Sequence, residues 1–199
     1  MDTGIIAAII TGVVGPIITY WVTKKIIERR KRPESECSCE FLASREAMYR
    51  KAHELIENAK SHVLDTTWGA DAPKLTTPES LARDKYIETR REVVKKGLSY
   101  KEIFTDTQGK KSRLQLSASE AKKDTTYQVR KIPSSAMTKP VIDFMVVDGE
   151  NVILSHVRSE RMQDNRFMFV KSKFLAQLFT KWFEDCWDVA KPVEVTDSV

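Results

Sequence analysis

An uncharged apolar stretch near the N-terminus, residues 5–22, limits the folds open to this chain more than any other feature. An α-helix rises about 1.5 Å per residue, so a helix of this length spans roughly 27 Å, which is close to the hydrocarbon thickness of a bilayer. Core helices of globular domains are usually shorter and keep a polar stripe. The stretch therefore predicts one transmembrane helix.

The charges on either side of this stretch indicate its orientation. Asp2 precedes it, and six basic residues follow it: Lys24, Lys25, Arg29, Arg30, Lys31 and Arg32. A cleaved signal peptide has the opposite order, with basic residues first and a small-residue cleavage site afterwards. Because cytoplasmic flanks carry the excess of Lys and Arg, we predict an uncleaved single-pass anchor with the N-terminus outside and the C-terminal domain in the cytoplasm.

Small residues recur at helical spacing within the predicted anchor. Ala8 and Gly12 are four residues apart, and so are Thr11 and Gly15. In lipid, such spacing lets two helix backbones approach closely. Self-association through these four residues is one interpretation, and a monomeric anchor with incidental glycines is the other.

The charge of the chain is concentrated at its N-terminal end. The net charge is +5, and residues 1–32, the anchor and its basic stem, hold six basic and two acidic residues. The rest of the chain is therefore nearly neutral and gives no indication of nucleic-acid binding. The basic stem is attracted to anionic membrane lipids, at about 1 kcal/mol per basic residue near the surface.

The cysteines do not form a metal-binding pattern. Cys37 and Cys39 form an isolated C-x-C, and Cys186 lies far from them. Metal clusters bring more ligands at set spacings, and an odd number of cysteines in a cytoplasmic domain favours free thiols. We expect neither a metal site nor a cofactor.

Helical and strand patterns alternate after the stem. We expect a linker over 33–43, a domain over 44–191 and a tail over 192–199. Within the domain we expect a helix capped by Ser44, a strand at 62–68, a helix from Thr77-Pro78 to Lys96 with Gly97 as its stop, a strand at 98–105, a helix at 109–123, a strand at 127–132, a hairpin over 141–157, a short strand at 167–170 and a helix at 173–190. This order predicts an α/β fold with a central mixed β-sheet flanked by helices.

Two C-terminal segments carry a recognisable pattern: FMVVDGENVILS, residues 144–155, and KFLAQLFTKWFEDCWDVA, residues 173–190. In these segments the chain resembles the phospholipase D-like superfamily. Members often show a strand, an Asp-Gly type turn, a second strand and a last helix with a Trp near its end. The resemblance covers about residues 44–190 and implies a phospholipase D-like fold.

The catalytic motif of that superfamily is not preserved here. Active members carry His-x-Lys-x(4)-Asp, in which the His attacks phosphorus and the Lys holds the phosphate oxygens. With Asp148 at the motif's Asp, the His position is Val141 and the Lys position is Asp143. Valine is not a nucleophile, and a carboxylate repels phosphate. The resemblance therefore implies a degenerate member, more readily a binding module than an enzyme.

Basic and hydroxyl side chains near the predicted strand ends form an alternative site. Its candidates are Lys139, Ser155, His156, Arg158 and Arg161. Because α/β folds commonly bind ligands at strand ends, these residues suit a phosphate-bearing ligand. An ordinary solvated loop is the other interpretation.

Three functions stay open. The first is a membrane-anchored binding or signalling module that takes a phosphate-bearing ligand or a protein partner. The second is a transmembrane effector of a bacterial defence or toxin-type system, whose helices cluster and disturb the membrane. The third is a phosphodiesterase or nuclease in which His156 is the nucleophile and a homodimer assembles the site.

Overall fold

The computed structural model describes residues 37–67, 75–106, 111–133, 142–156 and 166–193. Residues 1–36 and 37–199 are two separate units. The predicted anchor with Ala8, Thr11, Gly12 and Gly15, and its basic stem, lie outside the described residues. Of the helices in the described ranges, none has both the length and the apolar character needed to cross a membrane.

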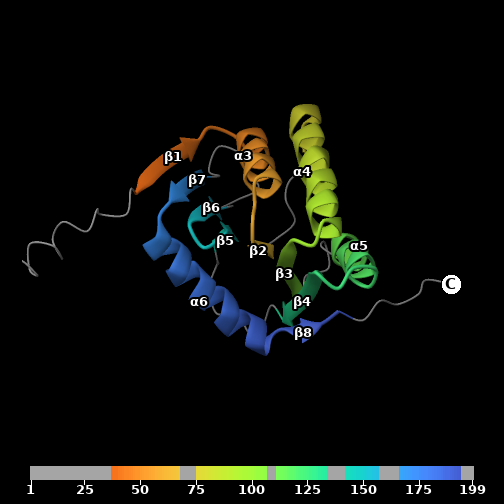
Figure 1. Cartoon of the computed structure of the whole chain (residues 1–199). Helices are drawn as coiled ribbons and strands as arrows, with labels where there is room; N and C mark the ends of the chain where they lie inside the picture. The colour runs from red at the N-terminus through yellow and green to blue at the C-terminus, as the bar shows by residue number, and fades with distance from the viewer. Residues whose placement is uncertain (1–36, 68–74, 107–110, 134–141, 157–165, 194–199) are drawn as a thin grey trace, which may run out of the picture. The chain divides into compact units, whose positions relative to one another are not determined.

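A mixed eight-stranded sheet forms the centre of residues 37–193 (Figure 1), with the strand order β1-β7-β6-β5-β2-β3-β4-β8. β2, β3 and β4 run parallel, and the other neighbouring strands pair antiparallel. The strands are β1 Ser38–Leu42, β2 His62–Thr67, β3 Ser99–Asp106, β4 Tyr127–Pro133, β5 Asp143–Val147, β6 Asn151–His156, β7 Arg166–Lys171 and β8 Lys191–Pro192. The predicted mixed sheet is confirmed.

Helices cover both faces of this sheet. α3 (Arg45–Glu57), α4 (Thr77–Lys95) and α5 (Lys111–Ala121) lie on one face, and α6 (Lys173–Val189) lies on the other (Figure 1). Ser44 caps α3 as predicted, because its hydroxyl accepts a hydrogen bond from the N–H of Ala47 at 3.1 Å. The cap of α4 is Thr76 and not Thr77, and it forms a capping box with Glu79.

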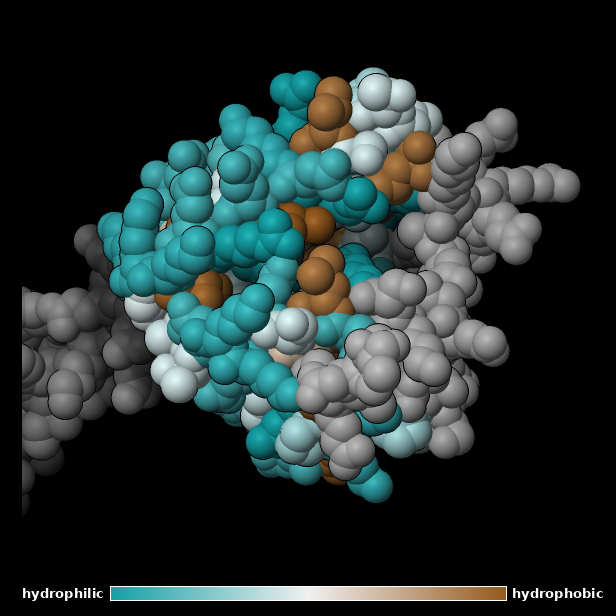
Figure 2. All heavy atoms as spheres, turned by 90° about the vertical axis from the view of Figure 1, so that its right-hand side faces the viewer, coloured by the Kyte–Doolittle hydropathy of each residue, from teal (hydrophilic) through white to brown (hydrophobic). Residues whose placement is uncertain are grey.

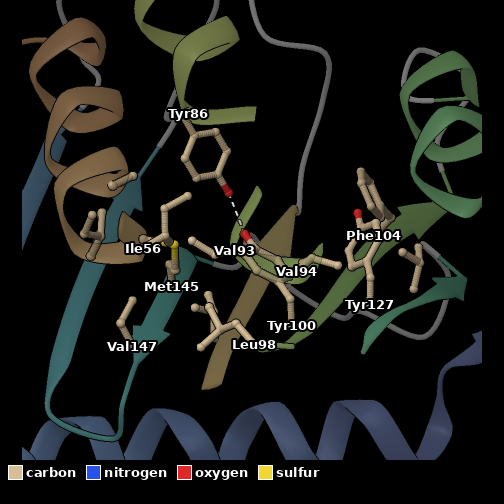
Figure 3. Close-up of a cluster of buried hydrophobic side chains, with 14 of the residues drawn as sticks. Ile56, Tyr86, Val93, Val94, Leu98, Tyr100, Phe104, Tyr127, Met145 and Val147 are labelled. Carbon is tan, nitrogen blue, oxygen red and sulfur yellow. Dashed lines mark hydrogen bonds between the residues drawn. The ribbon is translucent and has the colours of Figure 1, made fainter. Parts of the chain in front are cut away.

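Two apolar cores hold the layers together. The first lies between the sheet and α3, α4 and α5 and includes Tyr86, Tyr100 and Phe104 (Figure 3). The second lies beneath α6 and includes Ile103 and Phe183. Successive residues of β3 thus point into different cores, which is the pattern of a strand buried on both faces.

The outer surface of the domain is largely polar on one side. Figure 2 looks onto the side where α4, α5 and β8 lie in Figure 1. Its described surface is mostly hydrophilic, and hydrophobic side chains occur there in isolated spots. Scattered apolar side chains of this kind are normal for a monomeric surface.

The two edge strands lie in segments that were predicted to be linker and tail. Within the expected linker 33–43, residues 38–42 pair with β7 as β1. The expected tail begins inside β8, because Pro192 pairs with Arg130 of β4. Four of the five β1 residues are exposed, and β8 has two residues, so neither segment carries an alternating apolar pattern.

Candidate functional site

A pocket of about 100 Å³ opens at the end of the sheet where β2 and β6 end and β5 begins. Helices α3, α4 and α5 supply its other walls. Its polar lining consists of Tyr49, Asp65, Thr66, Thr67, Tyr86, Arg113, Asp143 and Ser155. α/β folds commonly bind ligands beyond the carboxyl ends of parallel strands, and β2 ends here.

The strand register brings acidic side chains together beneath this pocket. Asp143 of β5 pairs with Ser155 of β6, and both line the pocket. Asp65 of β2 stands opposite Glu102 of β3 on the neighbouring parallel strand. Asp65 and Glu102 are both buried. Two adjacent buried carboxylates are costly unless hydrogen bonds and cations offset them.

Two tyrosine hydroxyls donate hydrogen bonds to the buried carboxylate of Asp65. The hydroxyls of Tyr86 and Tyr100 donate to Asp65 Oδ2 at 2.8 and 2.7 Å. The two hydroxyl oxygens are themselves 2.6 Å apart (Figure 3). Burial raises the pKa of Asp65 to about 6, and the charge of Glu102 acts in the same direction. Burial also raises the pKa values of Tyr86 and Tyr100 well above the usual range, so both remain neutral hydroxyl donors.

Two arginines satisfy Glu102. Arg90 Nη1 lies 3.1 Å from Glu102 Oε2, and Arg113 Nη2 lies 3.3 Å from Glu102 Oε1. The Tyr127 hydroxyl donates to Oε2 at 2.5 Å. Arg90 continues to Glu120, at 2.7 Å. Burial acts to lower the pKa values of both arginines, but Glu102 and the neighbouring tyrosines together raise them overall. The guanidinium groups therefore stay charged.

Arg113 connects this buried network to the pocket. It lines the pocket, and 38% of its side chain is exposed, although it also pairs with Glu102. The described lining includes no His, Cys or Lys. The described residues also include no group of three or more His, Cys, Asp or Glu that could hold a metal ion. The arrangement can bind a polar ligand, but its described part supplies no strong nucleophile.

Asp65→Asn is expected to stabilise the domain more at pH 8 than at pH 4.5. Because the pKa of Asp65 is raised from 3.8 to about 6, the folded chain holds this proton more tightly than the unfolded chain. The stability from this group is present below about pH 4 and is lost as the pH rises to about 6. Asparagine carries no charge and removes that loss. Urea unfolding at the two pH values measures the change in the free energy of unfolding, and Asp84→Asn at an exposed position is the control. Equal effects of Asp65→Asn at both pH values would contradict the argument.

The structure places the predicted binding residues unevenly. Ser155 lines the pocket, together with Asp143 at the motif's lysine position. His156 is the last residue of β6, and its side chain lies outside the described residues. Further predicted positions lie outside the described ranges: Lys139, Val141, Arg158 and Arg161. Along the sequence, residues 134–141 precede β5 and residues 157–165 follow β6, two strands that line the pocket.

Asp148 has a separate, structural role in the hairpin between β5 and β6. Its carboxylate accepts hydrogen bonds from the backbone N–H groups of Lys60 and Ser61, at 2.8 Å each, and of His62 at 3.2 Å. The Ser61 hydroxyl donates at 2.8 Å. Partial burial acts to raise the pKa of Asp148, but these donors lower it overall. Asp143 is the first residue of β5 and Asp148 follows its last residue, so the two acids lie at opposite ends of this strand.

Sequence reasoning missed the buried charge network. Asp65, Glu102, Arg90 and Arg113 were not among the predicted site residues. One signal was available: both acids lie inside predicted strands, at positions whose neighbours two residues away are apolar or hydroxyl-bearing. A carboxylate on the buried face of a strand requires a partner, and such pairs gather at functional sites.

Solved structures share this fold at low sequence identity. Nuc from Salmonella typhimurium, a phospholipase D family member, is 12% identical with a TM-score of 0.55, over 80% of this chain and 99% of that chain. NucT from Helicobacter pylori is 10% identical with a TM-score of 0.53, over 79% of this chain and 99% of that chain. TrmBL2, an archaeal chromatin protein, is 16% identical with a TM-score of 0.53, over 92% and 64%. No family model and no curated protein matches the sequence. The chain therefore has a phospholipase D-like fold.

Proposed function

We propose that residues 37–193 are a non-hydrolytic ligand-binding module, and that the helix predicted from the sequence of residues 5–22 tethers it to a membrane. The observation that carries the proposal is the pocket itself. It lies where this kind of fold binds ligands, yet Asp143 occupies the position of the motif's phosphate-binding lysine, and the described lining has no strong nucleophile. A shared fold does not imply a shared activity. TrmBL2, described as a chromatin protein with a novel mode of DNA binding, has the same fold.

The proposed ligand is a small molecule that carries a phosphate and hydroxyl groups. Arg113 and Ser155 supply hydrogen-bond donors for the phosphate. Asp65 and Asp143, which also line the pocket, are acceptors for the hydroxyl groups of the ligand and would repel its phosphate, so they face the hydroxyl-bearing part in the proposed complex. Lys139, Arg158 and Arg161 add positive charge in the adjoining segments of the sequence. Because the pocket holds both a guanidinium and carboxylates, it suits a ligand that carries both a phosphate and hydroxyl groups.

The proposed tether rests on residues 5–22 and the basic residues that follow them. It places the domain on the cytoplasmic side, with membrane lipids as one partner. The exposed thiols of Cys37 and Cys39 provide the test. A membrane-impermeant maleimide should label them after permeabilisation and not before, and carbonate washing should leave the chain with the membranes. Labelling in intact cells or release by carbonate would contradict this topology.

Ser155→Ala is expected to weaken ligand binding about five-fold, because one hydrogen bond contributes about 1 kcal/mol. The full chain in detergent is first weighed by native mass spectrometry to find a co-purifying phosphate compound. Ribose 5-phosphate is then titrated as the probe by calorimetry. Ser119→Ala on α5, which does not line this pocket, is the matched control. No binding to any variant and no co-purifying compound would contradict the proposal.

Hydrolysis is tested on the same samples. Bis(p-nitrophenyl) phosphate, a general phosphodiester, should not be cleaved by the full chain. Turnover that disappears in His156→Ala would contradict a non-hydrolytic module. It would favour the phosphodiesterase interpretation, which requires a nucleophile beside groups that stabilise the phosphoryl charge.

A further inference from the structure

The two edges of the sheet differ in how they are protected. β8, at one edge, has two residues, and both are types that discourage pairing: Lys191 and Pro192. β1, at the other edge, has the five residues SCEFL, in which Glu40 is the one charged residue and neither Lys nor Pro occurs. Edge strands in stable monomers are usually short, charged or interrupted, because unpaired backbone groups recruit another strand.

β1 also presents an apolar side chain to solvent. Phe41 is 78% exposed, more than any other large hydrophobic residue of the described chain. It pairs with Met168, and Met168 pairs with Leu154, which packs into the core beneath α6. Phe41 therefore lies on the α6 face of the sheet. On that face α6 also leaves Phe174 and Leu178 exposed.

We propose that the edge of β1 that is not paired with any described strand pairs with β1 of a second copy of this chain. Antiparallel pairing of two identical strands is self-complementary about a two-fold axis, and closed two-fold dimers are the commonest assemblies. The pair joins two eight-stranded sheets into one continuous sheet. The same two-fold axis keeps both α6 helices on one face, together with both copies of Phe41.

The segment that precedes β1 argues for a second copy as the occupant. Residues 1–36 end two positions before Ser38, the first residue of β1. They hold the predicted transmembrane helix with its small-residue positions. Two copies that are tethered to one membrane by these predicted helices bring their β1 strands to a high local concentration. A five-residue edge buries less area than a standard stable interface. The high local concentration that the membrane tether provides compensates for this small contact area.

Phe41→Lys is expected to abolish the dimer of the full chain. The sample is the full chain in lipid nanodiscs, and the measurement is its mass by native mass spectrometry. Lysine on an edge strand discourages pairing with another strand, and in the dimer the substitution occurs on both strands. Leu81→Lys is the matched control, because Leu81 is 66% exposed on α4, away from the edge. Wild type and Leu81→Lys should be dimers, and Phe41→Lys should be monomeric.

Cross-linking tests the contact directly. In a Cys37→Ser/Cys186→Ser background, Cys39 is the single remaining cysteine. A register centred on Cys39 places the two Cys39 side chains directly opposite each other, with their Cβ atoms about 4.5–5.5 Å apart. A short bismaleimide should therefore link two chains, and Phe41→Lys should reduce the yield at least five-fold. A monomeric wild type, a dimer that Phe41→Lys leaves intact, or a dimer without the Cys39 cross-link would each overturn the proposal.

Discussion

Glu102→Ala is expected to lower the free energy of unfolding by about 3–5 kcal/mol. The Glu102 side chain is fully buried, and it accepts hydrogen bonds from Arg90, Arg113 and Tyr127. Alanine removes the acceptor and leaves the buried guanidinium of Arg90 with Glu120 as its remaining carboxylate partner among the described contacts. An uncompensated buried charge is among the most costly defects in a folded protein. Urea unfolding followed by far-ultraviolet circular dichroism measures the loss.

The control is a carboxylate with similar chemistry at the surface. Glu54 pairs with Lys51 at 3.0 Å, but its side chain is 60% exposed, so Glu54→Ala should cost less than about 1 kcal/mol. A second variant separates charge from packing. Glu102→Leu combined with Arg90→Met replaces the pair by apolar side chains and should recover much of the loss. Equal costs for Glu102→Ala and Glu54→Ala would show that the network does not stabilise the domain.

The same network also positions the candidate pocket. Arg113 reaches the pocket from α5 while one of its nitrogen atoms contacts Glu102 on β3. Asp65, the other buried acid, lines the pocket directly. Stability and the geometry of the site are therefore coupled in these residues. Glu102→Ala should therefore also weaken binding of the pocket's ligand, because Arg113 loses the carboxylate that orients its side chain.

The sequence indicated most elements of the fold because their patterns are local. The apolar residues of α6 recur at helical spacing, and β5 and β6 are short runs rich in β-branched residues. Each of these elements can therefore be recognised from its own stretch of sequence. Ser44 and Gly97 mark a helix start and a helix end, and Gly97 adopts φ +94°. β1 escaped prediction because four of its five residues are exposed and its place is set by pairing with β7.

The site was harder to predict because it depends on contacts between distant segments. Asp65 and Glu102 are 37 positions apart and meet only because β2 and β3 lie parallel in one register. Arg90 and Arg113 reach them from separate helices. No local spacing contains this information. Asp143 was singled out by the resemblance and Ser155 by its place near a predicted strand end, and the strand pair β5–β6 brings the two residues together.

Asp148→Ala is expected to lower the free energy of unfolding by about 2–4 kcal/mol, because a charged acceptor and a favourable turn residue are lost together. The carboxylate receives backbone hydrogen bonds from Lys60, Ser61 and His62, so it fastens the β5–β6 hairpin to the segment that joins α3 to β2. Asp148 also has φ 54°, a left-handed conformation that alanine tolerates poorly. Urea unfolding near neutral pH measures the change.

Two further variants separate these causes. Asp148→Gly accepts the backbone conformation but has no carboxylate, so it should recover about 1 kcal/mol of the loss at most. Asp148→Asn tolerates the left-handed conformation and keeps one oxygen acceptor, so it should lie between glycine and wild type. The pKa of Asp148 is lowered, so its contribution is present above the usual carboxyl pKa and is lost as the pH falls through the folded value. Full recovery in Asp148→Gly would show that the backbone conformation matters and the hydrogen bonds do not.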